Sequence, residues 1–513
     1  MYAFQVKAYS HHFVVSGYNY NAHRVVKEYA RRFASVEISR KWDGSITRTL
    51  TEIYAARSAD QKEYRFHIND IDTFFKHCEN LGYPLTSINF TTVPMFTPPP
   101  VEMKLLDGVI LRTHQVPIVE HLCKPLRSKL LELQTGGGKT LSTLAALVEI
   151  GHRAVIAIKG MYVERWKEDL VSPAKRKLDL SPKDLMIVRG SKHLKQLIAL
   201  GRAGLIEAKV IIITNKTLQA FYKHYRDTNG DCSFYGCAPH DFYRIIGVGV
   251  RVIDELHQNF HANFEQDLYS HLPTTINLSA TFKSDDDFIN RIYRIMHPRE
   301  TRAEVPNYVK YVAVYGITYQ LSDRDKVKWK QRGKGFYSHV VFEESIMACP
   351  KLLANYLLLI EEQLDIHYMS VYEPGARALI FASTIEMCKL IRDHLRQSFS
   401  FNDLTINKYT GEDEYSNLVT ADIAVSTIGS AGTAVDIENL ITVLSTTAVS
   451  KSETAIQNMG RIRESKTFKH IIPRFVYFIC TDVSKHVEYH QKKLNTYKGR
   501  ALSHDTLDTR RKV

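Results

Sequence analysis

Hydrophobic residues in the middle and C-terminal parts of the chain occur in short runs, without the alternation that marks a half-exposed strand. The first series is Leu130–Leu133, Ala154–Ile158, Val210–Thr214, Val250–Asp254 and Ile276–Ala280; the second is Ala376–Ala382, Ile423–Ser426, Ile441–Ser445 and Phe475–Cys480. Such runs, separated by longer stretches of partly helical pattern, are typical of strands buried on both faces of a parallel sheet. The pattern predicts two tandem doubly wound α/β domains.

Residues 1–95 follow a different pattern. Short β-rich runs at Tyr2–Tyr9, Phe13–Gly17, Ile46–Tyr54 and Tyr64–His67 alternate with helical patterns near Asn21–Phe33 and Ile71–Asn80. This predicts a small α/β domain. Four prolines in Val93–Pro100 favour extended chain without ladder hydrogen bonds, so we expect a linker over 96–104. The two sheets are then expected over 105–300 and 301–513.

The segment Leu130–Thr140 carries the residues that a phosphate chain requires. Glycines let backbone N–H groups approach phosphate oxygens, and the N-terminus of the expected helix Thr140–Ile150 adds its dipole. The pattern departs from G-x-x-x-x-G-K-[ST], because Leu133 occupies the first glycine position. The alternative is a chance glycine turn. The expected phosphate-loop residues are Thr135, Gly136, Gly137, Gly138, Lys139 and Thr140, with Lys139 on the β/γ-phosphates and Thr140 on Mg²⁺.

A pair of carboxylates follows the apolar strand Val248–Ile253, in the order Asp254-Glu255-Leu256-His257. A carboxylate at the C-terminal tip of such a strand lies where ligands of parallel sheets bind. We expect Asp254 to belong to the Mg²⁺ shell and Glu255 to orient or deprotonate the attacking water. An acidic strand end that faces solvent is the alternative.

The order of these motifs resembles a superfamily 2 helicase or translocase of the DExH kind. Leu111–Gln115 is similar to the Q motif of that family, and this implies that Gln115 reads the adenine. Ala154–Lys159 with Val163–Trp166 resembles motif Ia, a nucleic-acid contact. Ser279-Ala280-Thr281 matches the Ser-Ala-Thr motif, so the resemblance implies coupling roles for His257, Ser279, Thr281 and Gln457.

The second series carries the later motifs of the same family. Ala378–Ser383 resembles motif IV, and Ser426–Thr427 through Gly432–Ile437 resembles motif V, which implies that Asp436 belongs to the nucleotide site. Gln457–Arg463 resembles motif VI, but its second arginine, Arg463, comes one residue early. An arginine fork can hold the charge that develops on the γ-phosphate, so Arg461 and Arg463 are joint candidates for the arginine finger. An interdomain salt bridge is the alternative for either.

The resemblance implies two tandem RecA-like parallel-sheet domains after a small α/β N-terminal domain, with ATP and Mg²⁺ as cofactors. Arg40–Ile46 and Phe74–Tyr83 resemble the N-terminal domain of phage UvsW-type branch-migration helicases. The function so implied is an ATP-dependent DNA helicase that remodels forks and Holliday junctions in phage replication, recombination or repair. An RNA helicase, a double-strand translocase and a non-hydrolysing nucleic-acid clamp stay open as alternatives.

Composition and charge agree with a nucleic-acid partner. The chain has 513 residues, 44% of them hydrophobic, and 68 Lys and Arg against 55 Asp and Glu give a net charge of +13. Such an excess suggests a polyanionic partner, although a basic surface kept for solubility would give it too. Within the insertion near 324–337, the segment Lys326–Tyr337 combines basic residues with Trp329, Phe336 and Tyr337, and such a segment can bind both phosphates and unstacked bases. The tail Lys485–Val513 is basic as well.

Seven cysteines do not form an evident disulfide framework. Together with the lack of a signal peptide or a long apolar run, they predict a cytoplasmic protein that has no membrane partner. If the protein is phage-encoded, this would be the cytoplasm of the host. We also expect a monomer. Cys232 and Cys237, with His224 and His240 nearby, are zinc-ligand types, but a C-x4-C spacing is not diagnostic. We expect these four side chains to be free of metal.

Overall fold

The computed structural model describes residues 2–40, 46–134, 136–258, 260–305, 310–331, 336–411, 413–431, 437–465 and 467–513, with the side chains of 36–53 and 453 outside this description. The chain forms two compact units. The first comprises Met1–Leu133 and Gly137–Pro306, and the second comprises Gln134–Gly136 and Asn307–Val513. In the part described, no helix is long and apolar enough to cross a membrane.

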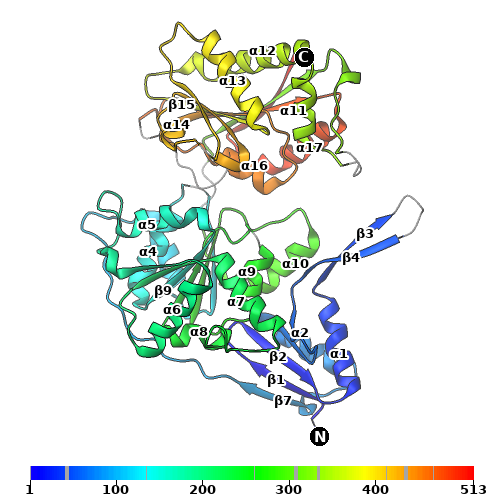
Figure 1. The fold of residues 1–513 in the computed structure, drawn as a ribbon, viewed down its shortest axis with the longest axis vertical. Coiled ribbons are helices and arrows are strands. Elements are labelled where there is room, and N and C mark those ends of the chain that lie inside the picture. Colours follow the sequence, from blue (N-terminus) through cyan, green and yellow to red (C-terminus); the bar gives the residue numbers. More distant parts are fainter. Residues whose placement is uncertain are drawn as a thin grey trace. The chain divides into compact units, whose positions relative to one another are not determined.

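The first unit begins with an N-terminal subdomain, a mixed sheet of order β5-β6-β2-β1-β7 with two helices. Its strands pair antiparallel, except that β1 runs parallel to β7. A separate antiparallel pair, β3 and β4, extends away from this sheet (Figure 1). The elements are β1 (Phe4–Ala8), β2 (His12–Gly17), α1 (Tyr20–Arg31), β3 (Ala34–Arg40), β4 (Ile46–Ile53), β5 (Ala56–Arg57), β6 (Glu63–His67), α2 (Ile71–Asn80) and β7 (Ile88–Thr92).

A six-stranded parallel sheet of order β10-β11-β9-β12-β13-β8 makes the rest of the first unit. Its central strands β9, β11 and β12 are buried at every position, as their continuous apolar runs predict. Its strands are β8 (Ser128–Glu132), β9 (Ala154–Ile158), β10 (Leu185–Val188), β11 (Val210–Thr214), β12 (Val250–Ile253) and β13 (Thr274–Ser279). The helices are α3 (Val116–Cys123), α4 (Lys139–Ile150), α5 (Val163–Val171), α6 (Gly190–Ala203), α7 (Asn215–Asp227), α8 (Pro239–Ile245), α9 (Phe260–Asp267) and α10 (Asp287–Met296).

Buried polar contacts join the N-terminal subdomain to this sheet. Arg251 on β12 and Asp267 at the end of α9 are fully buried and form an ion pair, and the His67 imidazole lies 3.4 Å from the same carboxylate. Although burial opposes it, Arg251 keeps the pKa of Asp267 below its usual value. His11 Nε2 also lies 2.9 Å from Thr275 Oγ1 of β13. Because the buried His67 and His11 of the subdomain contact Asp267 and Thr275 across the junction, the subdomain packs as part of the first unit.

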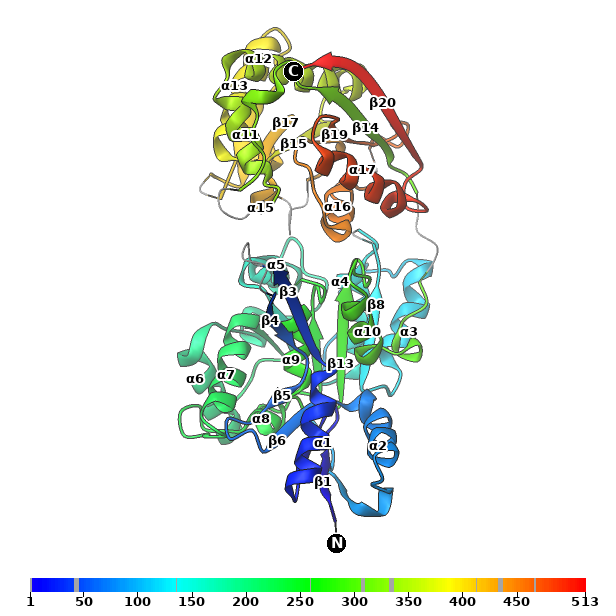
Figure 2. The same ribbon diagram turned by 90° about the vertical axis from the view of Figure 1, so that its right-hand side faces the viewer.

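The second unit is a seven-stranded parallel sheet of order β16-β17-β15-β18-β19-β14-β20. The C-terminal strand β20 pairs with β14 at the edge of the sheet (Figure 2). Its strands are β14 (Ala313–Gln320), β15 (Arg377–Ala382), β16 (Ile406–Tyr409), β17 (Ile423–Thr427), β18 (Leu440–Ser445), β19 (Arg474–Cys480) and β20 (Ser503–Lys512). The helices are α11 (His339–Met347), α12 (Pro350–His367), α13 (Ile385–Ser398), α14 (Ser416–Val419), α15 (Ile428–Ala431), α16 (Ser452–Met459) and α17 (Ser484–Tyr497).

Candidate functional site

Three adjacent strands of the six-stranded sheet bring the expected nucleotide-site residues to one edge. Strand β13 lies between β12 and β8, and all three run parallel, so their C-terminal ends meet. The phosphate loop follows β8, Asp254 follows β12, and Ser279 is the last residue of β13. Motifs I, II and III, which are far apart in the sequence, therefore lie side by side in the first unit.

The phosphate loop has a backbone that only glycine adopts easily. Gly136 and Gly138 have φ of 83° and 92°, and Gly138 directly precedes helix α4. A Cβ on Gly138 would lie 2.4 Å from Gln115 Nε2. Glycine at Gly138 is thus required both by its backbone angle and by the side chain that packs on it. Thr135 lies outside the described residues.

Gln115 braces this loop. Its side chain is 1% exposed; Nε2 donates to Gly138 O and to Ser142 Oγ, each at 3.2 Å, and Oε1 accepts from Arg112 N at 2.8 Å. Both amide protons are therefore used within the protein. The adenine-reading role implied by the family resemblance stays a prediction, and the observed role of Gln115 is to hold the turn into α4.

Lys139 and the two carboxylates form a compact charged group. Lys139 Nζ lies 3.5 Å from Glu255 Oε1, and the backbone N–H of Glu255 donates to Asp254 Oδ1 at 2.9 Å. Glu255 has a φ of 51°, in the left-handed region of backbone conformation that residues other than glycine rarely adopt. Burial, and next the neighbouring Glu255 charge, raise the pKa of Asp254. A cation at this position would relieve the repulsion between the two acids.

The indole of Trp166 contacts motif II. Its Nε1 donates to Asp254 Oδ2 at 2.9 Å, and the side chain is only 2% exposed. Sequence reasoning placed the segment Val163–Trp166 in a nucleic-acid contact, which stays a prediction; the Trp166 indole itself lies on the buried face of α5. Val163 is buried as well, whereas Glu164 and Arg165 are exposed. Trp166 fixes the carboxylate expected to bind metal.

Motifs II and III are joined by hydrogen bonds. His257 Nδ1 lies 2.8 Å from Ser279 Oγ, and Ser279 Oγ also bonds Thr281 O. Burial lowers the pKa of His257 to about 4, so the imidazole is neutral at pH 7. The structure thus brings together His257, Ser279 and Thr281, the three residues of the first unit that were assigned coupling roles.

The first-unit cluster has the parts that a magnesium nucleotide needs. Gly138, with its positive φ, leaves room for phosphate oxygens, Lys139 supplies a cation, and the Thr140 hydroxyl and Asp254 carboxylate are hard oxygen donors of the kind Mg²⁺ prefers. Lys159 Nζ and Tyr162 Oη, at 3.1 and 2.8 Å, both donate to Gln258 Oε1 beside motif II. Tyr162, Gln258 and Ser142 were not identified from the sequence, and Lys159 was predicted only as part of the nucleic-acid contact of motif Ia.

The second unit carries the remaining candidates. Gln457 lies on α16, and Arg461 and Arg463 follow the end of that helix; all three side chains are partly exposed. Motif IV coincides with β15 and the residue after it. The Glu343 carboxylate holds the chain that follows this strand, because it accepts from the backbone N–H groups of Ser383 and Thr384 at 2.8 and 2.9 Å. Asp436 and its neighbours 432–435 lie outside the described residues.

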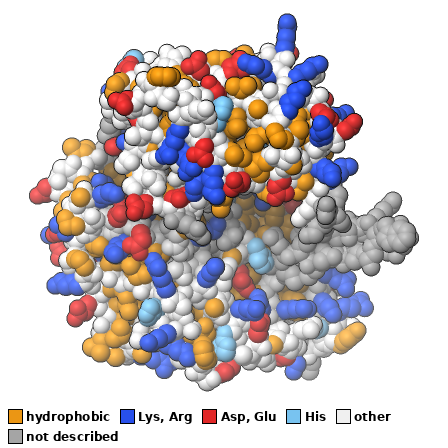
Figure 3. Space-filling view, turned by 45° about the horizontal axis from the view of Figure 1, so that its top comes forward, with side chains coloured by type: hydrophobic (Ala, Val, Ile, Leu, Met, Phe, Trp, Pro, Cys, Tyr) orange, Lys and Arg blue, Asp and Glu red, His pale blue; other side chains and the backbone are white. Residues whose placement is uncertain are grey.

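Basic and acidic side chains are mixed on one face of the molecule (Figure 3). On the face drawn in Figure 3, Lys and Arg side chains are interspersed with Asp and Glu side chains. In the basic segment 326–337, of which 332–335 lie outside the description, Trp329 packs on the core of the second unit and Tyr337 Oη lies 2.6 Å from His339 Nδ1. Phe336 is 69% exposed. Of the three aromatic side chains of the segment, Phe336 is the most exposed.

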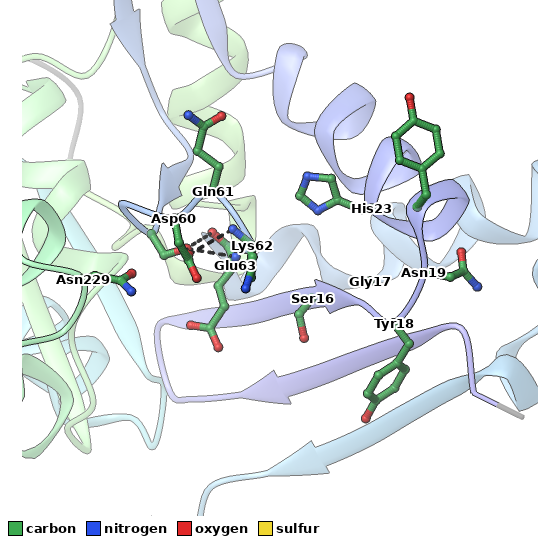
Figure 4. Close-up of a pocket in the computed structure, with 12 residues that line it drawn as sticks. Ser16, Gly17, Tyr18, Asn19, His23, Asp60, Gln61, Lys62, Glu63 and Asn229 are labelled. Carbon is green, nitrogen blue, oxygen red and sulfur yellow. Dashed lines mark hydrogen bonds between the residues drawn. The ribbon is translucent and has the colours of Figure 1, made fainter.

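A polar groove of about 700 Å³ lies on the N-terminal subdomain. Figure 4 shows the β5–β6 turn, with Asp60 and Lys62, on one side, and the β2–α1 turn, with Tyr18 and Asn19, on the other. The Tyr18 and Tyr20 side chains are 54% and 79% exposed. The groove carries both positive and negative side chains, so it is not a continuous basic surface for phosphates. Its exposed aromatic rings are of the kind that stack on unpaired bases.

The four candidate zinc ligands lie in the segment before β12. Cys237 is buried, and burial raises the pKa of its thiol to about 12. The Cys232 thiol donates to Gly230 O at 3.3 Å, and His224 packs on Phe234. Among the described residues, no three His, Cys, Asp or Glu side chains are grouped as a metal ion would require.

Comparison with known proteins gives structural likeness alone. No protein-family model and no curated protein matches the chain. It is similar to S. cerevisiae Dbp5 bound to RNA and ADP BeF3, with a TM-score of 0.47 and 12% identity over 77% of this chain and 90% of that one. It is also similar to the ATP-dependent Type ISP restriction-modification enzyme LlaBIII bound to DNA, with a TM-score of 0.52 and 12% identity over 79% of this chain and 31% of that one.

The likeness concerns the fold. Together with the observed parallel sheets, it confirms the predicted class: α/β, with two tandem RecA-like sheets after a smaller N-terminal sheet.

Proposed function

We propose that the chain is a nucleic-acid-stimulated ATPase that moves along DNA and remodels branched DNA, such as forks and Holliday junctions, in phage replication, recombination or repair. The observation that carries the proposal is the convergence of Lys139, Asp254 and Glu255 at one edge of a parallel sheet. The second unit, which is built on the other parallel sheet, also provides two arginines, Arg461 and Arg463, shortly after α16.

The residues of the first unit have distinct tasks in this proposal. Lys139 and the loop N–H groups bind the β- and γ-phosphates, and Thr140 and Asp254 hold Mg²⁺, which supplies charge neutralisation on the phosphates. Glu255 orients the attacking water and accepts its proton; its ion pair with Lys139 holds the carboxylate beside the phosphate loop. The His257–Ser279 contact passes a change at the nucleotide to β13.

The second unit supplies the arginine in this proposal. Arg461 or Arg463 places a planar guanidinium on the γ-phosphate charge. ATP binding and release then change the relation of the two units, and nucleic-acid contacts on each convert that change into stepping.

The N-terminal subdomain supports a role in recognising branches. His67 of the subdomain contacts Asp267, whose ion-pair partner Arg251 stands on β12 three residues before Asp254. A ligand on the subdomain is therefore held rigidly relative to the nucleotide site. The exposed Tyr18 and Tyr20 beside the groove fit unpaired bases at a junction.

A translocase on unbranched duplex DNA is the second candidate. It is favoured by the shared fold with LlaBIII, an ATP-dependent enzyme whose structure is bound to DNA. A clamp without ATP hydrolysis is disfavoured by the joint presence of Lys139, Asp254 and Glu255.

The test compares ATPase stimulation and strand separation on single-stranded DNA, duplex, forked DNA, four-way junctions and RNA. A preference for forks or junctions supports the proposal, a duplex preference supports the translocase, and an RNA preference replaces DNA as the substrate. Lys139→Ala and Glu255→Gln should each abolish stimulated hydrolysis, and the Gln variant should still bind ATP. Lys192→Ala, at an exposed position of α6, is the matched control. Full turnover by Glu255→Gln would remove that residue from the mechanism.

Recognition is tested with surface variants, because deleting the docked subdomain would uncover buried residues. Tyr18→Ala with Tyr20→Ala should reduce the preference for junctions and leave ATP hydrolysis on single strands intact. Tyr2→Ala removes a tyrosine that is 53% exposed and does not line the groove, and is the control. Equal loss of both activities, or an unchanged junction preference, would argue against recognition by the groove.

A further inference from the structure

A second cavity in the first unit, of about 520 Å³, lies at the amino-terminal edge of the six-stranded sheet. It is lined by the chain that follows β7, by the turn from α3 into β8, and by the first residues of β8 and β13, among them Lys129 and Thr274. Because the strands are parallel, this edge is opposite the one that carries Lys139 and Asp254. The cavity is therefore separate from the nucleotide site.

The polar lining of this cavity is basic. Lys124, Arg127 and Lys129 contribute to it, and none of the described lining residues is Asp or Glu. Lys124 and Arg127 are exposed, whereas Lys129 is 2% exposed. His271 also lines the cavity, but its Nδ1 accepts from Ser10 N and its Nε2 lies 3.1 Å from Pro94 O. His271 is thus a neutral structural group, and the positive charge comes from the two lysines and the arginine.

Lys129 is a buried cation without a counter-ion among the described residues. Its Nζ donates to Thr274 Oγ1 at 2.8 Å, and that hydroxyl in turn donates to Leu126 O at 2.7 Å. An ammonium has three donors, so this contact satisfies only part of it. Burial lowers the pKa of Lys129 to about 8, which reflects the cost of holding the charge there. An anion in the cavity would remove that cost.

The other walls are apolar. Val93, Met95, Leu126 and Ile150 line the space beside the basic groups. A volume of this size lies within the range of small-molecule sites, in which apolar walls bind the body of a ligand and a few polar groups orient it. The lining thus combines one buried amine, a basic mouth and an apolar body.

We propose that this cavity binds a small organic anion: its carboxylate or phosphate contacts Lys129, Lys124 and Arg127 flank the entrance, and its apolar part lies against Met95, Leu126 and Ile150. The site is independent of ATP. Because carboxylate and phosphate share the same recognition chemistry, the experiment distinguishes them.

The test is calorimetric titration of the full chain with octanoate, octyl phosphate, inorganic phosphate and, as the uncharged control, octanol. One of the two organic anions should bind saturably, and octanol and inorganic phosphate should bind at least about tenfold more weakly. The stronger of the two identifies the head group. Equal binding of octanol would show an apolar pocket only, and failure of both organic anions to bind would overturn the proposal.

Variants separate the cavity from general effects of charge. Lys129→Met keeps the aliphatic stem and should weaken the anion at least about tenfold. Because a buried substitution can disturb folding, the double variant Lys124→Gln with Arg127→Gln at the exposed mouth is the second test and should weaken binding several-fold. Lys192→Gln is the matched surface control, and Lys139→Ala should leave anion binding unchanged. Unchanged affinity in both cavity variants would overturn the proposal.

Proton linkage gives a readout that a structural role for Lys129 would not produce. A bound anion favours the charged amine, so binding at pH 8.5 should take up protons, measured as a dependence of the binding heat on the ionisation enthalpy of the buffer. This uptake should be absent in Lys129→Met. Uptake of the same size in that variant would show that another group meets the anion.

Discussion

Replacing Gly138 by alanine tests the packing of Gln115 on the phosphate loop. At a φ of 92° alanine costs about 1–2 kcal/mol. The new Cβ would also lie 2.4 Å from Gln115 Nε2, and this buried amide can move only by giving up its bonds to Gly138 O and Ser142 Oγ, at about 1 kcal/mol each. The expected total is about 3–4 kcal/mol.

A double-mutant cycle with Gln115→Ala separates the two causes. Gln115→Ala alone loses the brace, at about 2–3 kcal/mol, and the double variant loses the same brace only once and adds the backbone strain. The double variant should therefore be about 2 kcal/mol less destabilised than the sum of the single variants. Native-state hydrogen exchange of the α4 amides measures the local free energy of this segment.

Two other glycines of the first unit serve as controls. Gly204 has a φ of 68°, and no atom lies within 4 Å of the position that a Cβ would occupy there, so Gly204→Ala reports strain alone. Gly160 has neither strain nor a close neighbour, so Gly160→Ala should be nearly neutral. Effects of Gly138→Ala and Gln115→Ala that add within about 0.5 kcal/mol would refute the reasoning, because contacting residues should couple.

Three other changes test the site and the fold. Trp166→Phe removes the donor to Asp254, so kcat/KM for ATP should fall about tenfold or more while nucleic-acid affinity stays unchanged; weaker nucleic-acid binding with intact hydrolysis would support the contact role. Burial lowers the pKa of His11 to about 3, so below pH 6.5 the unfolded state binds a proton that the folded state does not, and stability decreases as the pH is lowered from 6.5 to 3. His11→Gln should make the melting temperature less dependent on pH in this range, and an unchanged dependence would contradict this. Burial raises the pKa of Glu343 to about 7, so stability should fall as pH rises from 4.5 to 7; Glu343→Gln should remove that loss, and its persistence would assign the loss to another group.

The sheets were predictable where strands are central and apolar. Runs such as Val210–Thr214 and Ala154–Ile158 match β11 and β9 to the residue, because burial on both faces demands apolar side chains at every position. Strand β20 was missed: as an edge strand it reads Ser-His-Asp-Thr-Leu-Asp-Thr-Arg-Arg-Lys and is mostly exposed. Strand β14 was missed because Gly316 and the partly exposed Tyr315 and Thr318 interrupt its apolar pattern.

The site was predictable only where its residues are neighbours in the sequence. Lys139, Asp254 and Glu255 stand in short motifs, whereas Trp166 bonds a carboxylate 88 positions away, and no local pattern reports such a pair. A signal for its burial did exist: Val163, Trp166 and Leu170 follow helical spacing, and all three are buried. Helical periodicity was therefore the guide to the place of this indole, since a side chain on the apolar stripe of a helix covering a sheet reaches the strand ends and not the solvent.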